Sequence, residues 1–441
     1  MIESFQNVFR IPELRRRIIF TLSLLAVYRI GGQIPTPGID HEVLSAFFSQ
    51  MGGTIFGLYN MFVGGAFERA TIFALGVMPY ISASIILQLL GSMWPYLQKL
   101  QKEGQEGQKK INQYTRYGTV LLSMVQALGI SYWLQDIRDE VGRSAVIDPG
   151  AGFIFVTVVT MTTGTVFLMW LGEQIQERGI GNGISLIIFV GIIAQFPIAA
   201  KSEFDAVMNG LRSGLVEIFI VAVWILIIAS VVLITQGQRR ITVQYPRRVV
   251  GRKVYGGQST HLPLRVNAAG VMPIIFAQSI MFVPGTFSSF FPDMAVFQTM
   301  VEWFQPGAFI YNALYGMLIV FFTYFYTSII FNPVDVADNM KRVGGFIPGI
   351  RPGKRTADYL DHILTRITLP GSVFLAIIAI VPFLIIRSMN VSLSASSFFG
   401  GTALLIVVGV ALDTLQQIES HLVSRHYEGF MKRGRVRGRA G

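Results

Sequence analysis

The stretch from Asn60 to Leu90 constrains the fold of this chain more than any other, because it is long, apolar and interrupted. It is about ten residues longer than the roughly 20 that one membrane span needs. Its first part contains Gly64–Gly65 and the charged pair Glu68–Arg69, which would be costly deep in hydrocarbon. The part from Gly76 onward is apolar enough to cross a bilayer. The stretch therefore predicts a half-inserted helix, a break at residues 76–79 and then a full span. Irregular backbone at that depth requires surrounding protein or a water-filled cavity.

A second copy of the break lies in the other half of the chain. Residues 76–86 read GVMPYISASII and residues 270–280 read GVMPIIFAQSI, with identity at seven of eleven positions. Chance similarity between apolar stretches is one interpretation, and an internal duplication is the other. In duplicated membrane proteins, corresponding interrupted helices of the two halves point to the working site.

Composition identifies the general class of the protein. The 441 residues are 52% apolar and only 14% charged, which is typical of a polytopic membrane protein. The absence of cysteine excludes disulfides, thiolate metal sites and thiol nucleophiles. The five histidines show no ligand spacing, and no acid–base pair or phosphate-binding loop stands out. We therefore expect no enzymatic activity, no metal and no cofactor.

The hydropathy pattern predicts an all-α protein with ten spans. They are expected near 18–34, 75–95, 116–134, 152–171, 182–200, 215–235, 268–289, 309–331, 366–387 and 399–418. Residues 1–200 would hold five spans and residues 201–418 the other five, with a basic tail at 419–441. With the N-terminus in the cytosol, 29 of the 36 lysines and arginines lie in cytosolic segments, as the positive-inside rule requires.

This orientation places both termini in the cytosol and makes the two GVMP helices antiparallel. The chain would then consist of two inverted five-helix halves, an architecture that many transporters share.

Outside the two terminal segments, 13 of the 19 lysines and arginines expected in the cytosol lie in two loops. In the loop 236–267, Ile241–Tyr245 and Lys253–Tyr255 are expected to form short strands, joined by a turn at Pro246–Gly251. In the loop 332–366, prolines and glycines predict a stiff tip that exposes Arg351, Lys354 and Arg355. Such loops either only fix the topology or also dock a polyanionic or acidic partner.

Several predicted spans contain polar but uncharged residues, among them Gln88, Asn182, Asn267, Gln278 and Ser279. Hydrogen bonding between helices explains them without any further role, at about 0.6 kcal/mol each on average. An ion-coupled transporter would normally add acidic residues, histidine or lysine near the midplane. Their scarcity there makes a pore or passive conduit more plausible.

The motifs along nearly the whole chain resemble the SecY family, the channel subunits of the general protein-translocation machinery, and the bacterial form is the more similar. The resemblance rests on RIGGQIPTPGID at 29–40, MFVGGAF at 61–67, IFALGVMPYISASIILQLL at 72–90, QYTRYGT at 113–119, MWLGEQIQERGIGNGIS at 169–185, QSTHLPLRVN at 258–267, FIPGIRPG at 346–353 and FGGTALLIVV at 399–408.

The resemblance implies a function and a set of site residues. Unfolded secretory proteins would cross the membrane through the chain, and hydrophobic segments would leave sideways through a lateral gate. The ring that closes the pore would consist of Val77, Ile81, Ile184, Ile188, Ile275 and Ile406. A plug helix at about 61–74 would include Phe62, Gly64, Gly65, Phe67, Glu68 and Arg69. Polar gate contacts would be Ser82, Gln88, Asn267 and Gln278, and the docking residues would be Arg252, Arg351, Lys354 and Arg355.

The resemblance also implies partners and a location. These are SecE- and SecG-like small membrane subunits, a SecA-type motor ATPase, the ribosome, signal sequences with nascent chains, and membrane lipids, all at the cytoplasmic membrane. The alternative function is a secondary transporter of a small solute built from inverted repeats. It would show saturable uptake by this chain alone.

Overall fold

The structure, a computed structural model, describes residues 11–51, 55–138, 142–210, 213–246, 248–250, 253–255, 259–290, 303–304, 308–389 and 401–433. Regular structure in these ranges is mainly helical, and a helix overlaps each of the ten predicted spans. Within them, seven helices are long and apolar enough to cross a membrane, and two shorter helices, at Met78–Met93 and Met272–Pro284, are also apolar. The all-α polytopic fold is confirmed, and the number of ten spans stays a prediction.

The chain divides into two compact units. Unit 1 comprises Met1–Ser202, Phe282–Glu302 and Val410–Gly441, and unit 2 comprises Glu203–Met281 and Trp303–Gly409. The division into inverted halves at residue 200 stays a prediction.

The helices that lie wholly in unit 1 are α2 (Pro12–Gly31), α3 (His41–Met51), α4 (Ile55–Phe62), α5 (Met78–Met93), α6 (Pro95–Lys102), α7 (Gln105–Asp136) and α8 (Ala151–Arg178). The elements of unit 2 are α10 (Gly214–Gln236), β1 (Gln238–Gln244), β2 (Arg248–Val250), β3 (Lys253–Tyr255), β4 (Ser259–Arg265), α13 (Phe309–Ile330), α14 (Pro333–Arg342) and α15 (Lys354–Met389). Three helices contribute residues to both units: α9 (Gly183–Met208), α11 (Met272–Phe290) and α17 (Thr402–Arg433).

Both GVMP motifs have the same local conformation. Gly76 has a φ of 57° and Gly270 a φ of 63°, in the left-handed region that favours glycine. Helices α5 and α11 begin two residues later, at Met78 and Met272, each with a proline as its second residue. A proline is tolerated in the first turn because the amide there has no partner within the helix. The predicted break is therefore present at both copies.

The helix expected at 61–74 lies earlier in the chain. Helix α4 covers Ile55–Phe62, and residues 63–77 form consecutive turns with a single bridge at Thr71. Gly64, Gly65 and Gly76 all have positive φ, and such residues interrupt an α-helix. The predicted bounds of this helix are wrong because the prediction gave the apolar composition of the segment more weight than its glycines.

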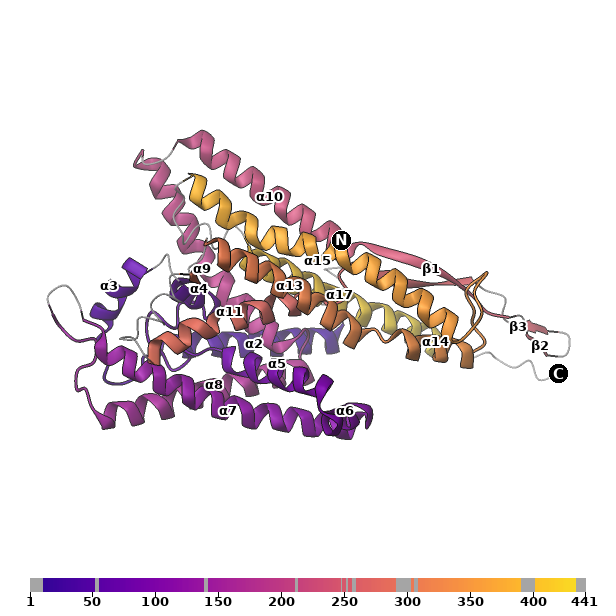
Figure 1. Cartoon of the computed structure of the whole chain (residues 1–441), viewed down its shortest axis with the longest axis horizontal. Coiled ribbons are helices and arrows are strands. Elements are labelled where there is room, and N and C mark those ends of the chain that lie inside the picture. The colour runs from indigo at the N-terminus through magenta and orange to yellow at the C-terminus, as the bar shows by residue number, and fades with distance from the viewer. Residues whose placement is uncertain are drawn as a thin grey trace. The chain divides into compact units, whose positions relative to one another are not determined.

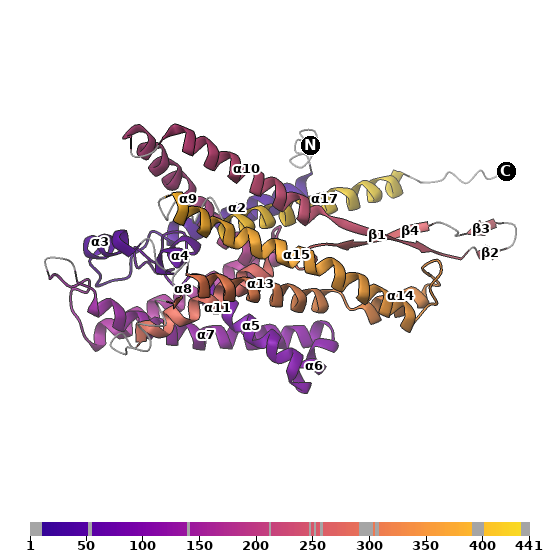
Figure 2. The same cartoon turned by 45° about the horizontal axis from the view of Figure 1, so that its top comes forward.

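Helices α5 to α8 form the main helical layer of unit 1. Helix α7 packs along α8 and against α5 and α6 (Figures 1 and 2). Arg116 of α7 donates from Nε and Nη2 to the two carboxylate oxygens of Glu173 in α8, both at 2.8 Å. Because the pair is half-exposed, we expect it to fix the alignment of the two helices rather than to add more than about 1 kcal/mol.

In unit 2 the loop after α10 folds into two antiparallel ribbons (Figure 2). Strand β1 pairs with β4 from Gln238↔Arg265 to Gln244↔Ser259, and β2 pairs with β3. The prediction was correct for β3, close for β1 and wrong for the turn, because Arg248–Val250 forms β2. Strand β4, which contains Pro263, was not predicted. A proline is compatible with an edge strand, and within the described residues β4 pairs with β1 alone.

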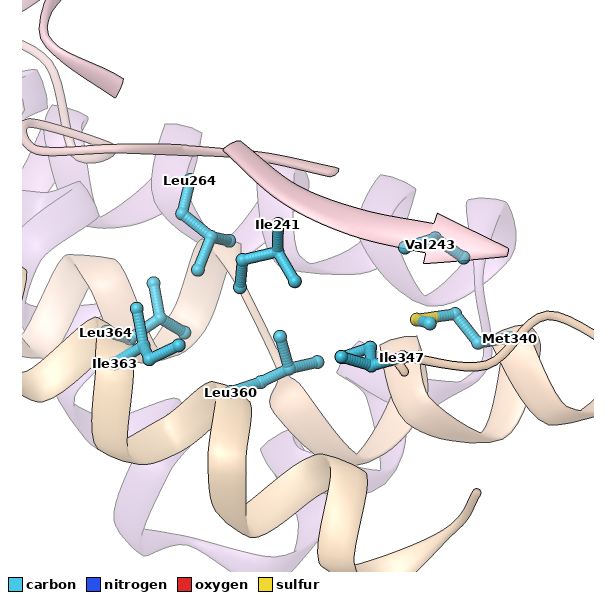
Figure 3. Packing of buried hydrophobic residues seen from close by; sticks show 8 residues of the cluster. All are labelled: Ile241, Val243, Leu264, Met340, Ile347, Leu360, Ile363 and Leu364. Carbon is cyan, nitrogen blue, oxygen red and sulfur yellow. The ribbon is translucent and has the colours of Figure 1, made fainter. Parts of the chain in front are cut away.

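The second loop packs on this ribbon and makes a hydrophobic core, which we call the loop core (Figure 3). Gln244 of β1 and Phe346 exchange backbone hydrogen bonds of 2.9 and 3.0 Å, so the loop continues the sheet. The members of the loop core are buried side chains of β1, β4, α14, the loop that follows α14, and α15: Ile241, Val243, Leu264, Met340, Ile347, Leu360, Ile363 and Leu364. The two loops therefore form one folded body.

Substitution of Leu360 by alanine tests the loop core. Leu360 is fully buried, and we expect the change to remove about 2–5 kcal/mol from the stability of this body. Hydrogen exchange of the β1 amides should accelerate by at least about 30-fold. Asp358→Ala on the exposed side of α15 is the control and should leave exchange unchanged. Equal exchange in Leu360→Ala and the control would contradict the loop core.

Candidate functional site

Residues 63–77, which we call the turn segment, are held in a conformation that small residues allow. Gly64 and Gly65 have φ values of 69° and 82°, and Ala70 has a φ of 40°. A residue with a Cβ in this region is strained by roughly 1–2 kcal/mol. The Ala70 amide donates to the Phe67 carbonyl at 2.9 Å, which offsets part of that cost. Strained backbone of this kind is characteristic of functional segments.

The chain just after α2 supplies backbone partners to the turn segment. The Thr36 amide donates to the Ala70 carbonyl and the Ile72 amide donates to the Ile34 carbonyl, both at 3.0 Å. Pro35 and Thr71 form an antiparallel bridge between these two bonds. Each bond contributes about 0.5–1.5 kcal/mol net, and each would leave a costly unpaired group if it were broken without water.

Side chains of α2 and of the residues that follow it hold other parts of the turn segment. The Tyr28 hydroxyl donates to the Val63 carbonyl at 3.3 Å, and the Arg29 guanidinium donates to the Gly64 carbonyl at 3.4 Å. Arg69, which is exposed, donates to the side-chain oxygen of Gln33. The arginine of the sequence pair Glu68–Arg69 is therefore at the surface of unit 1.

Helix α9 approaches the turn segment more closely than side chains permit. A Cβ on Gly64 would lie 2.9 Å from the Cα of Gly191. A Cβ on Gly65 would lie 2.6 Å from the side-chain nitrogen Nε2 of Gln195. Real Cβ atoms do not come this close. The Gly64–Gly191 contact therefore brings two backbones together directly.

Aromatic rings surround the turn segment at Phe67. Its ring stacks on Trp133 of α7, with ring centroids 5.9 Å apart, and lies edge-on to Tyr59 of α4 at 5.0 Å. Phe48 of α3 packs edge-on from another direction. Aromatic pairs contribute about 0.5–1.5 kcal/mol beyond the burial of their area. Phe67 is the main apolar anchor of the segment.

Glu68 is bound by Asn60 of α4 through two hydrogen bonds. Asn60 Nδ2 donates to the Glu68 carboxylate at 3.0 Å, and the Glu68 amide donates back to Asn60 Oδ1 at 2.9 Å. Phe62, at the end of α4, is buried and lies edge-on to Phe282 of α11. The six predicted plug residues thus lie in or next to the turn segment.

Four of the predicted ring residues belong to unit 1. Val77 precedes the first residue of α5, and its carbonyl accepts from the Ile81 amide at 3.1 Å. Ile184 and Ile188 lie one turn apart on α9, and the Ile184 side chain packs against Gly172 of α8. Val77, Ile81 and Ile188 are buried, and Ile184 is partly buried.

The other two, Ile275 and Ile406, belong to unit 2. A Cβ on Gly409 of α17 would lie 2.0 Å from the Val271 side chain, so α17 meets the start of α11 there. Ile275 and Ile406 each lie about one helical turn from these contact residues, and both are buried.

The candidate gate residues form hydrogen bonds mainly with residues close to them in the sequence. Gln88 Nε2 donates to Ser84 Oγ one turn earlier in α5, at 3.0 Å, and Ser82 is partly buried on the same helix. Asn267 Nδ2 donates to the Gly270 carbonyl at 3.1 Å and closes the turn before α11. Gln278 is buried and interacts with the Tyr311 hydroxyl of α13.

The basic tip of the second loop is exposed as predicted. Arg351, Lys354 and Arg355 all have exposed side chains. Thr356 Oγ1 donates to the Arg351 carbonyl at 2.9 Å, and Gly353 has a φ of 102°, so the tip has a defined conformation. Arg252, the fourth predicted docking residue, lies outside the described residues.

Two helices near these sites were not predicted, although their start signals are in the sequence. Asn332 caps α14 by accepting from the Val334 amide at 3.1 Å, and Pro333 is the first residue of that helix. Asp40 caps α3 in the same way through the Glu42 amide at 2.9 Å. An Asx residue before a short amphipathic stretch is a start signal that could have located both.

Comparison with known proteins places the chain in one family. A family model described as SecY matches residues 71–415. The protein translocase subunit SecY of Aquifex aeolicus is 46% identical over 434 residues, covering 98% of this chain and 100% of that protein. The protein of the same name from Escherichia coli strain K12 is 47% identical over 429 residues, covering 97% of this chain and 96% of that protein.

Solved structures share the fold at low sequence identity. A structure described as a protein-conducting channel has a TM-score of 0.64 at 16% identity, and each chain covers 93% of the other. Sec61 in a canine ribosome–channel complex has a TM-score of 0.62 at the same identity and coverage. The family model matches most of this chain, and two SecY proteins are 46–47% identical to it over nearly its whole length. The chain therefore belongs to the SecY family.

Proposed function

We propose that this chain is the central subunit of a protein-conducting channel. It passes unfolded secretory proteins across the membrane and releases hydrophobic segments sideways into lipid. The observation that carries the proposal is the 46–47% identity to protein translocase subunits over at least 97% of the chain. The small-solute transporter has no support from these relatives.

Sorting by a lateral gate requires no active site. A segment with ten leucine-like residues gains about 3–6 kcal/mol on entering lipid, and two central lysines or aspartates cost about 5–7 kcal/mol. The balance of these terms decides whether a segment crosses or enters the membrane. The proposed gate residues are Ser82 and Gln88 in unit 1 and Asn267 and Gln278 in unit 2.

The turn segment is the proposed plug, together with the end of α4. Hydrogen bonds of about 0.5–1.5 kcal/mol each and aromatic stacking hold it. Such contacts can be exchanged for contacts with water or a translocating chain without breaking a buried ion pair. The proposed ring comprises Val77, Ile81, Ile184 and Ile188 of unit 1 with Ile275 and Ile406 of unit 2. Aliphatic side chains of this kind stop ions by excluding water.

The proposed partners follow from the family and from the exposed basic tip. They are SecE- and SecG-like subunits, a SecA-type motor, the ribosome, signal sequences with nascent chains, and lipids of the cytoplasmic membrane. A relative of this fold was observed in a ribosome–channel complex. Both termini and both basic loops are proposed to lie in the cytosol, where lysine and arginine accumulate. The motor or the ribosome supplies the energy.

A cysteine cross-link tests the path of the polypeptide, because the chain has no native cysteine. We expect Ile406→Cys to form a disulfide with a cysteine in a stalled secretory precursor, and only when the signal sequence is functional. Leu215→Cys on α10, which is 79% exposed, is the control and should not react. Reaction at the gate positions but at no ring position would show that the chain passes elsewhere.

Substitution of Gly64 by leucine tests the plug. The side chain would collide with Gly191, and the left-handed backbone adds about 1–2 kcal/mol, so the turn segment should leave its place. We expect a higher resting ion conductance of reconstituted channels, as for a deletion of Phe62–Arg69. Gly214→Leu, in open space at the start of α10, is the control. Normal conductance in both the substitution and the deletion would refute the plug.

Reversal of charge at the tip tests docking. Arg351→Glu should weaken motor-driven export of a precursor, because an attractive contact to an acidic partner becomes repulsive. Insertion of the channel itself should stay normal, since Arg351 is exposed and outside the loop core. Lys341→Glu, on exposed α14, is the control for a general loss of positive charge. Export at the normal rate in Arg351→Glu would exclude a role of this arginine in docking.

A further inference from the structure

A cavity of about 410 Å³ lies between α13 and α15 in unit 2. One face of α13 lines it with residues spaced three or four apart: Phe321, Tyr324, Phe325 and Ser328. The facing residues of α15 follow the same spacing: Asp361, Leu364, Thr365 and Thr368. The Tyr324 hydroxyl donates to the Thr365 carbonyl at 3.2 Å and joins the two helices at this place. The volume is in the range of small-molecule sites, about 300–1,000 Å³.

The cavity lies where both helices change from apolar to charged sequence. Helix α13 is apolar up to its end at Ile330, and α14 begins at Pro333 and contains Asp335 and Asp338. Helix α15 is charged up to Arg366 and apolar after it. Since α13 and this part of α15 are long and apolar enough to span a membrane, the cavity is at the boundary between hydrocarbon and water. An occupant at this level is an amphiphile.

The lining combines four aromatic side chains with four hydroxyl-bearing ones, and it has one charge, which is negative. Phe321 and Phe325 stack with ring centroids 6.1 Å apart, and Phe321 is 52% exposed. Asp361 is the charged lining residue, and among the described residues it has no recorded ion pair. A carboxylate next to aromatic rings attracts an ammonium group and repels an anionic headgroup. Ser328 and Thr365 add hydroxyl groups at the same level.

We propose that the cavity between α13 and α15 binds one phospholipid with a primary-amine headgroup, of the phosphatidylethanolamine class. The ammonium group donates hydrogen bonds to Asp361, the headgroup region meets the hydroxyls of Ser328 and Thr365, and the start of the acyl chains lies on Phe321 and Phe325. A quaternary ammonium lacks the N–H groups that this arrangement uses, and an anionic headgroup adds repulsion. The site therefore distinguishes between lipids of similar shape.

Fluorescence quenching in vesicles tests the proposal on the full-length chain assembled with its small membrane subunits. Because the chain has no cysteine, Ile329→Cys, 50% exposed and one turn after Phe325 on α13, gives one labelling position for a fluorophore beside the cavity without removing a lining side chain. Acyl chains dibrominated near the glycerol quench it on contact. We expect phosphatidylethanolamine to bind about tenfold more strongly than phosphatidylcholine or phosphatidylglycerol, as one hydrogen-bonded charge contact implies. Met317→Cys, 68% exposed on the same helix, should be quenched equally by all three.

Asp361→Asn should remove the preference at the Ile329→Cys label, and Asp358→Asn, an exposed carboxylate one turn earlier, should keep it. Unchanged quenching at Met317→Cys in both variants shows that the protein is intact. Equal quenching by the three lipids, or a preference that survives Asp361→Asn, would overturn the proposal. So would a label at Ile329→Cys that no lipid quenches, because a polypeptide then covers the cavity.

Discussion

The structure of unit 1 depends on one requirement: a non-helical backbone within a membrane protein must find partners for its amides and carbonyls. Residues 63–77 cannot satisfy each other as a helix would, because their glycines and Ala70 have positive φ. Ile34 and Thr36 complete the bonding, and Tyr28 and Arg29 reach carbonyls that the backbone leaves open. The RIGGQIPTPG sequence after the first helix is thus the structural partner of the turn segment, about 35 residues away in the chain.

The two loops of unit 2 are stabilised differently, by hydrophobic burial. They extend beyond the apolar parts of α10, α13 and α15, and the loop core stabilises them. Ile241 and Val243 alternate along β1, so both belong to the loop core, while the basic side chains of the tip remain in water (Figure 3). A docking surface on such a body has fixed geometry. Burial of aliphatic side chains, at about 25 cal/mol per Å² of apolar area, gives the loops a stability that their charge alone could not provide.

The sequence predicts the helices well and the connections poorly, for physical reasons that individual residues illustrate. Apolar runs of span length locate the long helices because few other structures accommodate them. The GVMP repeat predicts the breaks at Gly76 and Gly270 because glycine and proline act locally. Gly64 and Gly65 end α4 at Phe62, a local signal that the apolar composition outweighed. The packing of the turn segment against Gly191 and Trp133 depends on tertiary contacts, and no local pattern encodes these. Strand β4 was missed because Pro263 argues against a strand unless the edge position is known. The site residues came from family motifs, since an aliphatic ring has no chemical signature of its own.

Helix α15 joins the exposed basic tip to the membrane interior without an intervening loop. It runs from Lys354 to Met389, about 54 Å at 1.5 Å per residue. Pro370 and Pro382 lie in its interior and cannot donate the usual hydrogen bond, so resistance to bending is lowest at these two positions. Next to Pro370, which is the nearer to the tip, Gly371 touches the Val266 backbone, where a Cβ would lie 2.9 Å from the carbonyl oxygen. A force applied at the tip would therefore be transmitted along a stiff rod and converted into flexure first at Pro370, next to the strand end that leads into α11.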